Sequence, residues 1–498
     1  MNLKQGDRKM TSYSDFVTYA SARNPSLSTL SSFLGNRGRN LYISKIISME
    51  VNTEGRASDY TMMNIQNLAA KIRDFQQQAS QGYGGGLFIA IEDPGPNELN
   101  DIGAILDIDP FFLAGHLAVS YQAIERSPSS PLHGILPSRI ASAEYINIHF
   151  QKVLDLGHEE DSGPSPYKTK TQGNASRHLR ILPSLSGRKI GLARSCLSIL
   201  KKQIGDSAWI CIILTDRPTS QPSNSYPEPR QINVEEVVSL PTYSSFAGSA
   251  QRSFSLRSSS QAEDLLSILR EQRITLGSDS NTPGALDLAH YPIRVALTEW
   301  KLYVQLMSRY VKFFETLSAR LEQKDVIELH RWRRRSSQSL HKIRMIMAFV
   351  DYWRGRDGGV AQKHDSWDLL VLDLAHIEMQ IKQYANALES LNPIIMSLIQ
   401  LANSRRSMSE ASDVRRLTYI AVVFIPLSFV AALFSMGDNF LPGRESFWLY
   451  WATSIPITLA VLAVMSLHLL KAYFLHLSGK LQGWLLTWKR GKWTIDRE

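Results

Sequence analysis

Small and hydroxylated side chains gather on one face of an apolar segment near the C-terminus. Between Leu417 and Gly437 the chain has no charged side chain, and the first charge after this run is Asp438. Such a face most often marks close packing between helices. In a symmetric ring of helices, it would instead line a narrow path for a solute. At 3.6 residues per turn, the face consists of Leu417, Ala421, Ile425, Ser428, Ala432 and Ser435.

Two apolar segments, 417–437 and 446–470, are expected to position this face in a membrane. At 1.5 Å per residue, each helix is long enough to cross a hydrocarbon core of about 30 Å. Only the short loop 438–445 separates them, so they are predicted to form a two-helix transmembrane hairpin. Trp448, at the start of the second helix, belongs to an expected interfacial belt of aromatic residues.

The distribution of basic residues predicts the orientation of the hairpin. The loop has one basic residue, Arg444, against Asp438 and Glu445, whereas both flanks are basic. The positive-inside rule therefore places both termini in the cytosol and makes 471–498 a basic cytosolic tail. The sequence does not identify the membrane, and the plasma membrane is favoured. The basic flanking residues are Arg405, Arg406, Arg415 and Arg416 before the hairpin, and Lys471, Lys480, Lys489, Arg490 and Lys492 after it.

A helical stalk is predicted over residues 293–416, as helices 293–323 and 325–354 followed by a third long helix. Apolar residues of the third helix recur in steps of three and four, the heptad period of helices that pack along their length, as in a coiled coil. Pro393 is expected to bend this helix rather than end it. Packing between subunits and a hairpin within one chain explain the pattern equally well. Its residues are Leu370, Leu374, Ile377, Ile381, Tyr384, Leu388, Leu391, Ile395, Leu398 and Ala402.

A mixed α/β domain is predicted over residues 41–215, preceded by a polar N-terminal tail, 1–40. Ile-rich segments bounded by Gly, Pro or Asp predict four strands, and 62–78 and 187–203 are expected to be helices. Residues 216–292 are rich in Ser and Pro, which predicts a mostly disordered linker with a short helix near 260–273. The fold class is thus an α+β cytosolic domain, a long helical stalk and a C-terminal transmembrane hairpin. The predicted strands are 41–51, 86–92, 144–150 and 208–215.

The first apolar segment, "LTYIAVVFIPLSFVAALFSM" at 417–436, resembles the first membrane helix of the CorA-like divalent-cation (magnesium) transporters. The similarity includes Leu417-Thr418, Phe424, Pro426-Leu427-Ser428-Phe429, Ala431, Phe434 and Met436. "LDIDPFFLAGHL" at 106–117 and "NSRRSMSEASDVRRLT" at 403–418 resemble the divergent fungal branch. The resemblance implies a homopentamer in a lipid bilayer, whose pore is lined by five copies of the first membrane helix. Leu417, Ile425 and Ser428 fall at its pore-lining positions.

The pore mouth departs from the family signature. Where the family has Gly-Met-Asn, this chain has Ser435-Met436-Gly437. In the family, the Asn presents amide oxygens to a hydrated cation, and Gly437 has no side chain for this task. Magnesium releases its water reluctantly, so oxygens one or two residues further on could hold the hydrated ion instead. Asp438 and Asn439 are therefore the metal candidates; alternatively, both are ordinary turn residues.

Other patterns favour neither an enzyme nor a nucleic-acid-binding protein. No zinc-site spacing, Ser-His-Asp arrangement or carboxylate pair stands out among the 498 residues, and no cofactor is implied. The net charge of +9 suits a membrane surface or nucleic acid. The basic run "HRWRRR" at 330–335 spreads around all faces of a helix, which favours a solvated or membrane-proximal face. Asp365, Asp368 and Asp373 are candidates for binding regulatory ions between subunits, or else form the polar face of the stalk.

These observations predict an oligomeric membrane channel or transporter for divalent metal cations, with magnesium as the first choice. Ion transport would be passive and would need no ATP. The competing hypothesis is a membrane-anchored scaffold or sensor that retains the architecture and has lost conduction together with the signature. The positions 435–439 discriminate between the two hypotheses.

Overall fold

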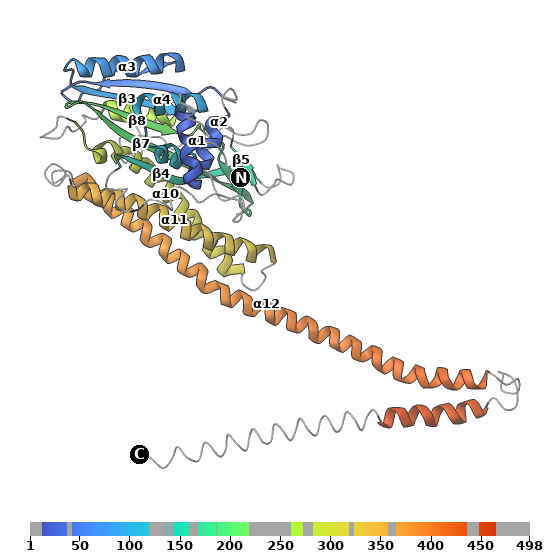
Figure 1. Ribbon diagram of the computed structural model, residues 1–498. Coiled ribbons are helices and arrows are strands. Elements are labelled where there is room, and N and C mark those ends of the chain that lie inside the picture. The colour runs from blue at the N-terminus through green and yellow to red at the C-terminus, as the bar shows by residue number, and fades with distance from the viewer. Residues whose placement is uncertain are drawn as a thin grey trace, which may run out of the picture. The chain divides into compact units, whose positions relative to one another are not determined.

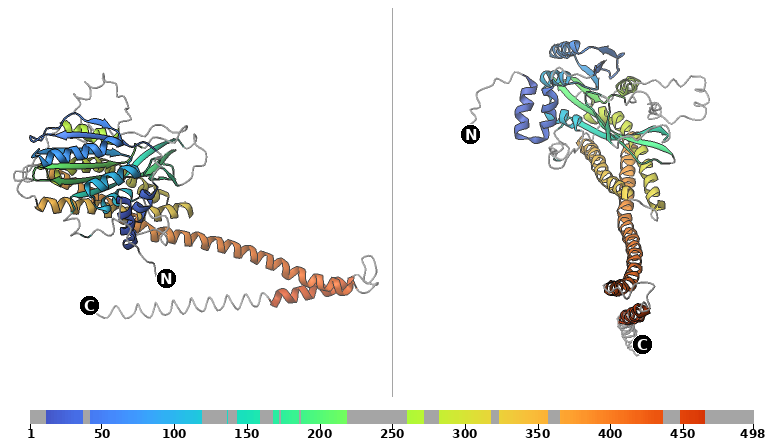
Figure 2. Two further views of the ribbon diagram at one scale, coloured as in Figure 1. Left: turned by 45° about the horizontal axis from the view of Figure 1, so that its top comes forward. Right: turned by 90° about the vertical axis from the view of Figure 1, so that its right-hand side faces the viewer.

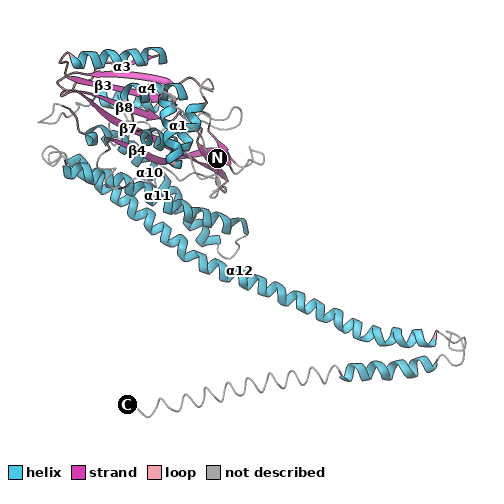
Figure 3. Cartoon of the chain, viewed as in Figure 1, coloured by secondary structure: helices cyan, strands magenta, loops and turns pink. Residues whose placement is uncertain are grey.

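The computed structural model of the protein divides into two units, Met1–Asn392 and Pro393–Glu498, and the sheet formed by the described strands lies in the first unit. Figure 3 shows the strands and helices of the described residues. The structure describes residues 12–36, 42–118, 136, 143–158, 168–171, 173–185, 187–218, 260–271, 282–317, 323–356, 365–435 and 448–464.

The sheet has eight strands in the described part of the chain, and all four segments predicted as strands belong to it. The strand order is β2-β1-β3-β8-β7-β6-β5, with β4 paired to β7. The β3–β8 pair is parallel, whereas the other pairs are antiparallel. The strands are β1 (Lys45–Val51), β2 (Thr61–Met63), β3 (Gly85–Glu92), β4 (Tyr145–His158), β5 (Lys168–Lys170), β6 (His178–Ile181), β7 (Arg188–Ile204) and β8 (Ala208–Thr215).

The prediction of a helix over 187–203 is wrong, because this segment is the long strand β7. Its apolar residues fit a helical period as well as an alternating one, and tertiary pairing decides between them. Strand β4 pairs along one edge of β7 from Arg188 to Leu200. The opposite edge is shared by β6 and β8. A helix here would leave the facing edges of three strands without hydrogen-bond partners.

Both faces of the central strands are buried. In β3, Leu87, Ile89 and Ile91 belong to one hydrophobic core, and the intervening Phe88 and Ala90 are equally inaccessible on the other face. The first core is closed by helices α3 (Ile65–Ser80), α4 (Pro96–Leu106) and α5 (Pro110–Leu117). Burial on two faces explains why these strands are continuous apolar runs rather than alternating ones.

The N-terminal segment is not a polar tail from residue 12 onward, which corrects the prediction for 1–40. Residues 12–36 form α1 (Tyr13–Arg23), a short 3-10 helix (Pro25–Leu27) and α2 (Ser28–Gly35). Several of their apolar side chains, among them Val17, Leu30 and Leu34, lie in the same core as α4 and α5. The Tyr13 hydroxyl donates to the carbonyl of Ile108 at 2.7 Å, which ties α1 to the loop between these two helices.

The opposite face of the sheet is covered by helices from the second half of the chain. Helix α10 (Ala285–Leu317) contacts β4 and β7, and α9 (Gln261–Glu271) contacts β1, β3 and β8. Figures 1 and 2 show α10 and α11 (Gln323–Arg356) along the side of the sheet away from α3. The short helix expected near 260–273 is α9. Helix α10 already begins at Ala285, inside the predicted linker, because Leu286, Leu288 and Ala289 bury their side chains.

Candidate functional site

The predicted first membrane helix is the end of α12, which runs from Asp365 to Phe434. Among the described residues, the helical stretch Trp367–Phe434 contains one window long and apolar enough to cross a membrane, and only 11% of that window is buried. A second, shorter apolar helix spans Trp448–Val464. In the second unit, the two helices lie side by side, as both views of Figure 2 show.

One face of α12 packs against this C-terminal helix. Pro426 and Val430 are buried, and the Phe434 ring meets the Tyr450 ring edge-on, with centroids 6.2 Å apart. These three residues follow one another in steps of four, so they share one side of the helix. On the other helix, Ser454 is fully buried. Small side chains allow membrane helices to approach closely, and this packing defines the inner face of the hairpin.

The stripe predicted from the sequence lies on the other side of α12. Ser428 and Ala432 lie two residues beyond Pro426 and Val430, and two residues turn a helix by about 200°. Both are exposed, and Leu417 and Ile425 each expose 66% of their surface. All six residues of the stripe are exposed in the single chain: Leu417, Ala421, Ile425, Ser428, Ala432 and Ser435.

The predicted pore mouth lies almost entirely outside the described residues. Ser435 follows the last turn of α12, and its backbone N–H donates to the carbonyl of Ala431 at 2.9 Å. Met436, Gly437, Asp438 and Asn439 are not described. The assignment of metal-binding oxygens to Asp438 and Asn439 therefore stays a prediction.

The heptad seam of α12 is buried within the first unit from Leu370 to Leu391. The Trp367 ring lies 4.6 Å from the His290 ring of α10, measured between centroids. Ion pairs join α12 to α11, with Arg344 Nε 2.7 Å from Glu378 Oε1. Packing inside one chain, the alternative to packing between subunits, thus accounts for this part of the seam. The buried seam residues there are Leu370, Leu374, Ile377, Ile381, Leu388 and Leu391, with Tyr384 half-buried.

Of the three stalk carboxylates, Asp368 and Asp373 have described side chains, and neither belongs to a group that could hold a metal ion. Asp368 is paired with Arg354, and Asp373 is exposed. Asp365 begins α12, and its side chain is not described. Within the described ranges, no three His, Cys, Asp or Glu side chains are grouped in a way that could hold a metal ion.

The basic run at 330–335 is largely engaged inside the protein. Arg335 is buried and pairs with Glu328 at 2.6 Å, and Arg331 pairs with the same carboxylate at 3.0 Å. Arg333 lies 3.3 Å from Glu389 of α12. These arginines join α11 to its own carboxylates and to α12.

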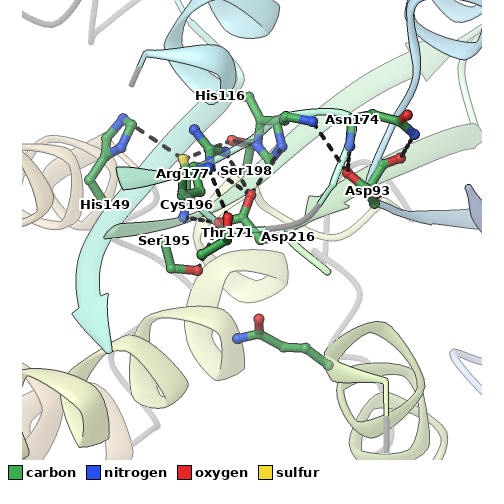
Figure 4. Close-up of polar contacts among 12 residues, drawn as sticks. Asp93, His116, His149, Thr171, Asn174, Arg177, Ser195, Cys196, Ser198 and Asp216 are labelled. Carbon is green, nitrogen blue, oxygen red and sulfur yellow. Dashed lines mark hydrogen bonds and ion pairs between the residues drawn. The ribbon is translucent and has the colours of Figure 1, made fainter. Parts of the chain in front are cut away.

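A second polar site, which the sequence did not predict, lies at the end of the parallel strands (Figure 4). Asp216 directly follows β8 and accepts two hydrogen bonds from Arg177 on one oxygen, Oδ1. Its other oxygen accepts from the Ser195 hydroxyl and from the backbone N–H of Cys196, each at 2.9 Å. Burial by itself would raise the pKa of Asp216, but the charge of Arg177 and these hydrogen bonds bring that pKa below its ordinary value.

Buried histidine and cysteine side chains extend this site into the sheet. His116 of α5 makes a 2.9 Å hydrogen bond with the Ser198 hydroxyl, and Cys196 Sγ lies 3.8 Å from His149 Nε2. Burial lowers the pKa of His116 to about 3 and raises the pKa of Cys196 to about 12. Both groups are therefore neutral at physiological pH, and they act as packed polar residues rather than as an acid–base pair.

Asp93 is the counterpart of Asp216 directly after the neighbouring strand β3. Its Oδ1 accepts from the backbone N–H groups of Asn174 and Ala175, at 2.7 and 3.3 Å. The sequence signal for this site is a carboxylate immediately after each Ile-rich strand, in "FIAIED" and "CIILTD". Because β3 and β8 are parallel, the two acids meet at one edge of the sheet.

The fold and the apolar hairpin define the class: a protein with an α/β domain, a long stalk helix and a membrane-capable C-terminal end. Residues 315–471 match the family described as "CorA-like Mg2+ transporter protein". This region of the chain is therefore CorA-like, which confirms the resemblance found in residues 417–436. The match does not test the Ser435-Met436-Gly437 detail, which stays a prediction.

Two curated relatives share shorter segments with the chain. The "Notoamide biosynthesis cluster protein M'" of Aspergillus versicolor is 26% identical over 139 residues, which are 24% of this chain. The "Cobalt/magnesium transport protein CorA" of Thermotoga maritima is 29% identical over 92 residues, which are 18% of this chain. The matches span only 30% and 24% of the lengths of these two relatives.

Two solved structures resemble the chain at low similarity. The CorA magnesium transporter from Methanocaldococcus jannaschii has 10% sequence identity and a TM-score of 0.30, and the match covers 85% of this chain and 97% of that one. The full-length CmaX protein has 14% identity and a TM-score of 0.32, with 85% and 98% of the two chains covered.

Proposed function

We propose that the protein is an oligomeric membrane channel or transporter for divalent metal cations, with magnesium as the principal ion. The observation that carries this proposal is the position of the stripe Leu417–Ser435, which faces away from the C-terminal helix and is exposed in the single chain. The names of the family and of the Thermotoga maritima relative supply the chemical class of the ion.

The exposed stripe suits a path at the centre of a ring of chains. An isolated hairpin needs no small or hydroxylated outer face, since lipid tails contact large apolar side chains equally well. With five copies around an axis, Ser428 and Ala432 would leave room for a hydrated cation, and Leu417 and Ile425 would form an apolar gate. Passage down an electrochemical gradient requires neither a catalytic residue nor ATP.

At the mouth of the path, we propose that Asp438 and Asn439 replace the amide ring of the family signature. Their oxygens could hold a magnesium ion through its water shell, without removing the water. A ring of carboxylates attracts divalent cations more strongly than a ring of amides does, and it discriminates less among them. Both termini are proposed to be cytosolic, as the basic flanks of the hairpin predict, and the plasma membrane is the favoured membrane.

Metal uptake by liposomes that contain the purified full-length protein tests this function. Wild type and Asp438→Ala/Asn439→Ala are compared with a magnesium-sensitive and a zinc-sensitive dye. We expect uptake of magnesium by the wild type and a loss of at least tenfold in the double variant. Glu445→Ala is the matched control, because it removes one carboxylate from the same loop and should change uptake less than twofold.

The outcomes separate the hypotheses. Uptake that survives the double substitution would keep the transporter and reject Asp438 and Asn439 as its metal ligands. A folded and assembled wild-type protein that takes up neither metal would contradict the proposed function and favour the non-conducting scaffold. The number of subunits is measured on the same preparation by native mass spectrometry, with five expected.

A further inference from the structure

Helix α9 is a short element that covers part of the sheet face opposite α3. Its 11 residues, Gln261–Glu271, lie against β1, β3 and β8. An isolated helix of this length is marginal in water, so α9 depends on its contacts with the sheet. A change at those contacts can therefore release the helix. Its buried side chains are Ala262, Leu265, Leu266, Ile268 and Leu269.

Ser260 caps the N-terminus of α9. Its Oγ accepts from the backbone N–H of Glu263 at 3.4 Å, and its carbonyl accepts from the N–H of Asp264 at 3.0 Å. The sequence Ser-Gln-Ala-Glu at 260–263 is that of a capping box, a typical signal for the start of a helix. The Glu263 carboxylate pairs with Lys45 of β1 at 2.8 Å. The first turn of α9 is thus fixed to the sheet.

The Ser260 hydroxyl also contacts a buried carboxyl group. It donates to Oε2 of Glu92, the last residue of β3, and the backbone N–H of Ala262 donates to the same carboxyl group. Ser260 is 3% exposed and Glu92 is 7% exposed. Burial raises the pKa of Glu92, and of the charged groups around it Lys45 opposes this rise and Glu263 adds to it. The contact suits a small hydroxyl donor and leaves no room for a second anion.

The sequence around Ser260 has the charge pattern of a kinase substrate. Acidic residues, Glu263 and Asp264, lie three and four positions after it. Acidophilic serine kinases select an acid three positions after the serine that they modify, and such charge patterns contribute to their specificity. Of the three consecutive serines at 258–260, Ser260 alone has an acid at that position. The recognition signal therefore coincides with the residue that caps the helix.

We propose that Ser260 is a phosphorylation site and that its modification releases α9 from the sheet. The phosphoryl donor is ATP, bound by an acidophilic serine kinase. The Ser260 oxygen forms a bond to the γ-phosphorus, the bond between this phosphorus and the β,γ-bridging oxygen breaks, ADP leaves, and the hydroxyl proton is released. Because Ser260 is buried in the docked helix, the kinase acts on the released form, and the phosphate then prevents its return.

A phosphoserine cannot take the place of Ser260 in the docked helix. The group carries about −1.5 to −2 charges at pH 7, and it no longer has the hydroxyl proton that Ser260 donates to Glu92. A phosphate is favourable at an exposed helix N-terminus, but here it would lie buried against a carboxylate. Lys45, the nearby cation, is already shared with Glu263. Repulsion therefore outweighs the attraction of the helix dipole.

Release would uncover an apolar part of the sheet. Glu92 alternates along β3 with Phe88 and Ala90, so the three side chains share the face that α9 covers. Phe88 and Ala90 are fully buried in the docked state. Exchange of backbone amides reports this change directly, because α9 loses its hydrogen-bonded structure when it leaves the sheet.

Two variants of the same shape test the charge at position 260. Asn and Asp cap helices about as well as Ser does, so Ser260→Asn and Ser260→Asp differ mainly in charge. Hydrogen–deuterium exchange of the full-length protein in detergent, at pH 8.0 to keep Glu92 ionised, measures the protection of the α9 amides. We expect Ser260→Asn to keep protection within about threefold of wild type and Ser260→Asp to lose at least about tenfold.

The same pair in a Glu92→Gln background identifies the source of the effect. Without the Glu92 carboxylate, the difference between Asn and Asp at position 260 should fall below about threefold. Equal protection of α9 in the two single variants would overturn the proposal, as would a wild-type α9 that exchanges without protection. A difference that persists undiminished in Glu92→Gln would overturn the role of Glu92.

Incubation of the full-length protein with casein kinase II and ATP tests the modification itself, with phosphorylated peptides identified by mass spectrometry. We expect phosphate on Ser260 and a loss of α9 protection in the modified molecules. Ser267 is the matched serine on the same helix; Arg270 lies three positions after it, so it should stay unmodified. An unmodified Ser260, in a reaction that phosphorylates a Ser-Gln-Ala-Glu peptide, would overturn the site. A phosphorylated protein with fully protected α9 would overturn the release.

Discussion

Arg177 donates to a single carboxylate oxygen of Asp216 through both Nε and Nη2, at 2.9 and 2.7 Å. Both residues are buried, so neither charge is screened by water. The pair joins the segment before β6 to the end of β8, across the width of β7. It holds together the edge of the sheet at which Asp93 also lies.

Removal of one member of this pair should destabilise the α/β domain strongly. We predict that Arg177→Met lowers the free energy of unfolding by about 3–5 kcal/mol, because it leaves the Asp216 carboxylate buried without its counter-charge. Urea unfolding of the full-length protein, followed by tryptophan fluorescence, measures this, since Trp209 lies on β8. The exposed pair Arg56–Glu54 is the control, and Arg56→Ala should lower the free energy of unfolding by less than about 1 kcal/mol. Equal midpoints for the two variants would contradict the prediction.

The same ion pair predicts how stability changes in acid. The pKa of Asp216 is lower in the folded protein than in the unfolded chain, where an Asp pKa is about 3.9. The contribution of Asp216 to the free energy of unfolding is therefore fully present above that pH. It is lost as the pH falls toward the folded-state pKa. Between pH 5 and pH 3, wild type should lose more stability than Asp216→Asn, whose amide does not titrate over this range. Parallel unfolding curves for the two proteins in acid would exclude this contribution.

Glycine at position 86 is required by the packing of the neighbouring strand. A Cβ atom there would lie 2.1 Å from the Trp209 indole ring, and this ring is fully buried. We expect Gly86→Ala to lower the free energy of unfolding by about 1–3 kcal/mol or more, because the buried ring would have to shift. Gly35→Ala offers a matched comparison, because its Cβ would meet nothing within 4 Å at the end of α2. That change should be neutral or slightly stabilising. Thermal unfolding of the full-length protein and both variants measures the two effects.

The proposed path predicts different effects for two adjacent alanines of α12. Ala432 lies on the stripe, whereas Ala431 lies about 100° away around the helix. Ala432→Trp should block metal uptake in the liposome assay at least tenfold, and Ala431→Trp should retain most of it. Native mass spectrometry of both variants shows whether each still assembles. Equal uptake by two assembled variants would mean that the stripe does not line the path.

Some parts of the fold could be predicted because neighbouring residues determine them. The four Ile-rich strands, the stalk helices and the apolar hairpin segments each have a local period and clear end signals. That Leu417, Ser428 and Ala432 share one face follows from 3.6-residue periodicity alone. The resemblance to the CorA-like family also lies in a contiguous segment, Leu417 to Met436.

Other features depended on contacts between distant residues, which a single sequence does not specify. Segment 187–203 has a pattern compatible with helix or strand, and pairing with β4, β6 and β8 made it the strand β7. Residues 12–36 are rich in serine, yet α4 and α5 provide a surface on which Val17, Leu30 and Leu34 are buried. Asp93 and Asp216 are 123 positions apart in the sequence, and only the parallel pairing of β3 and β8 brings them to one pocket. Local periodicity thus determined the membrane-capable helix, whereas the tertiary pairing of strands decided where charge accumulates.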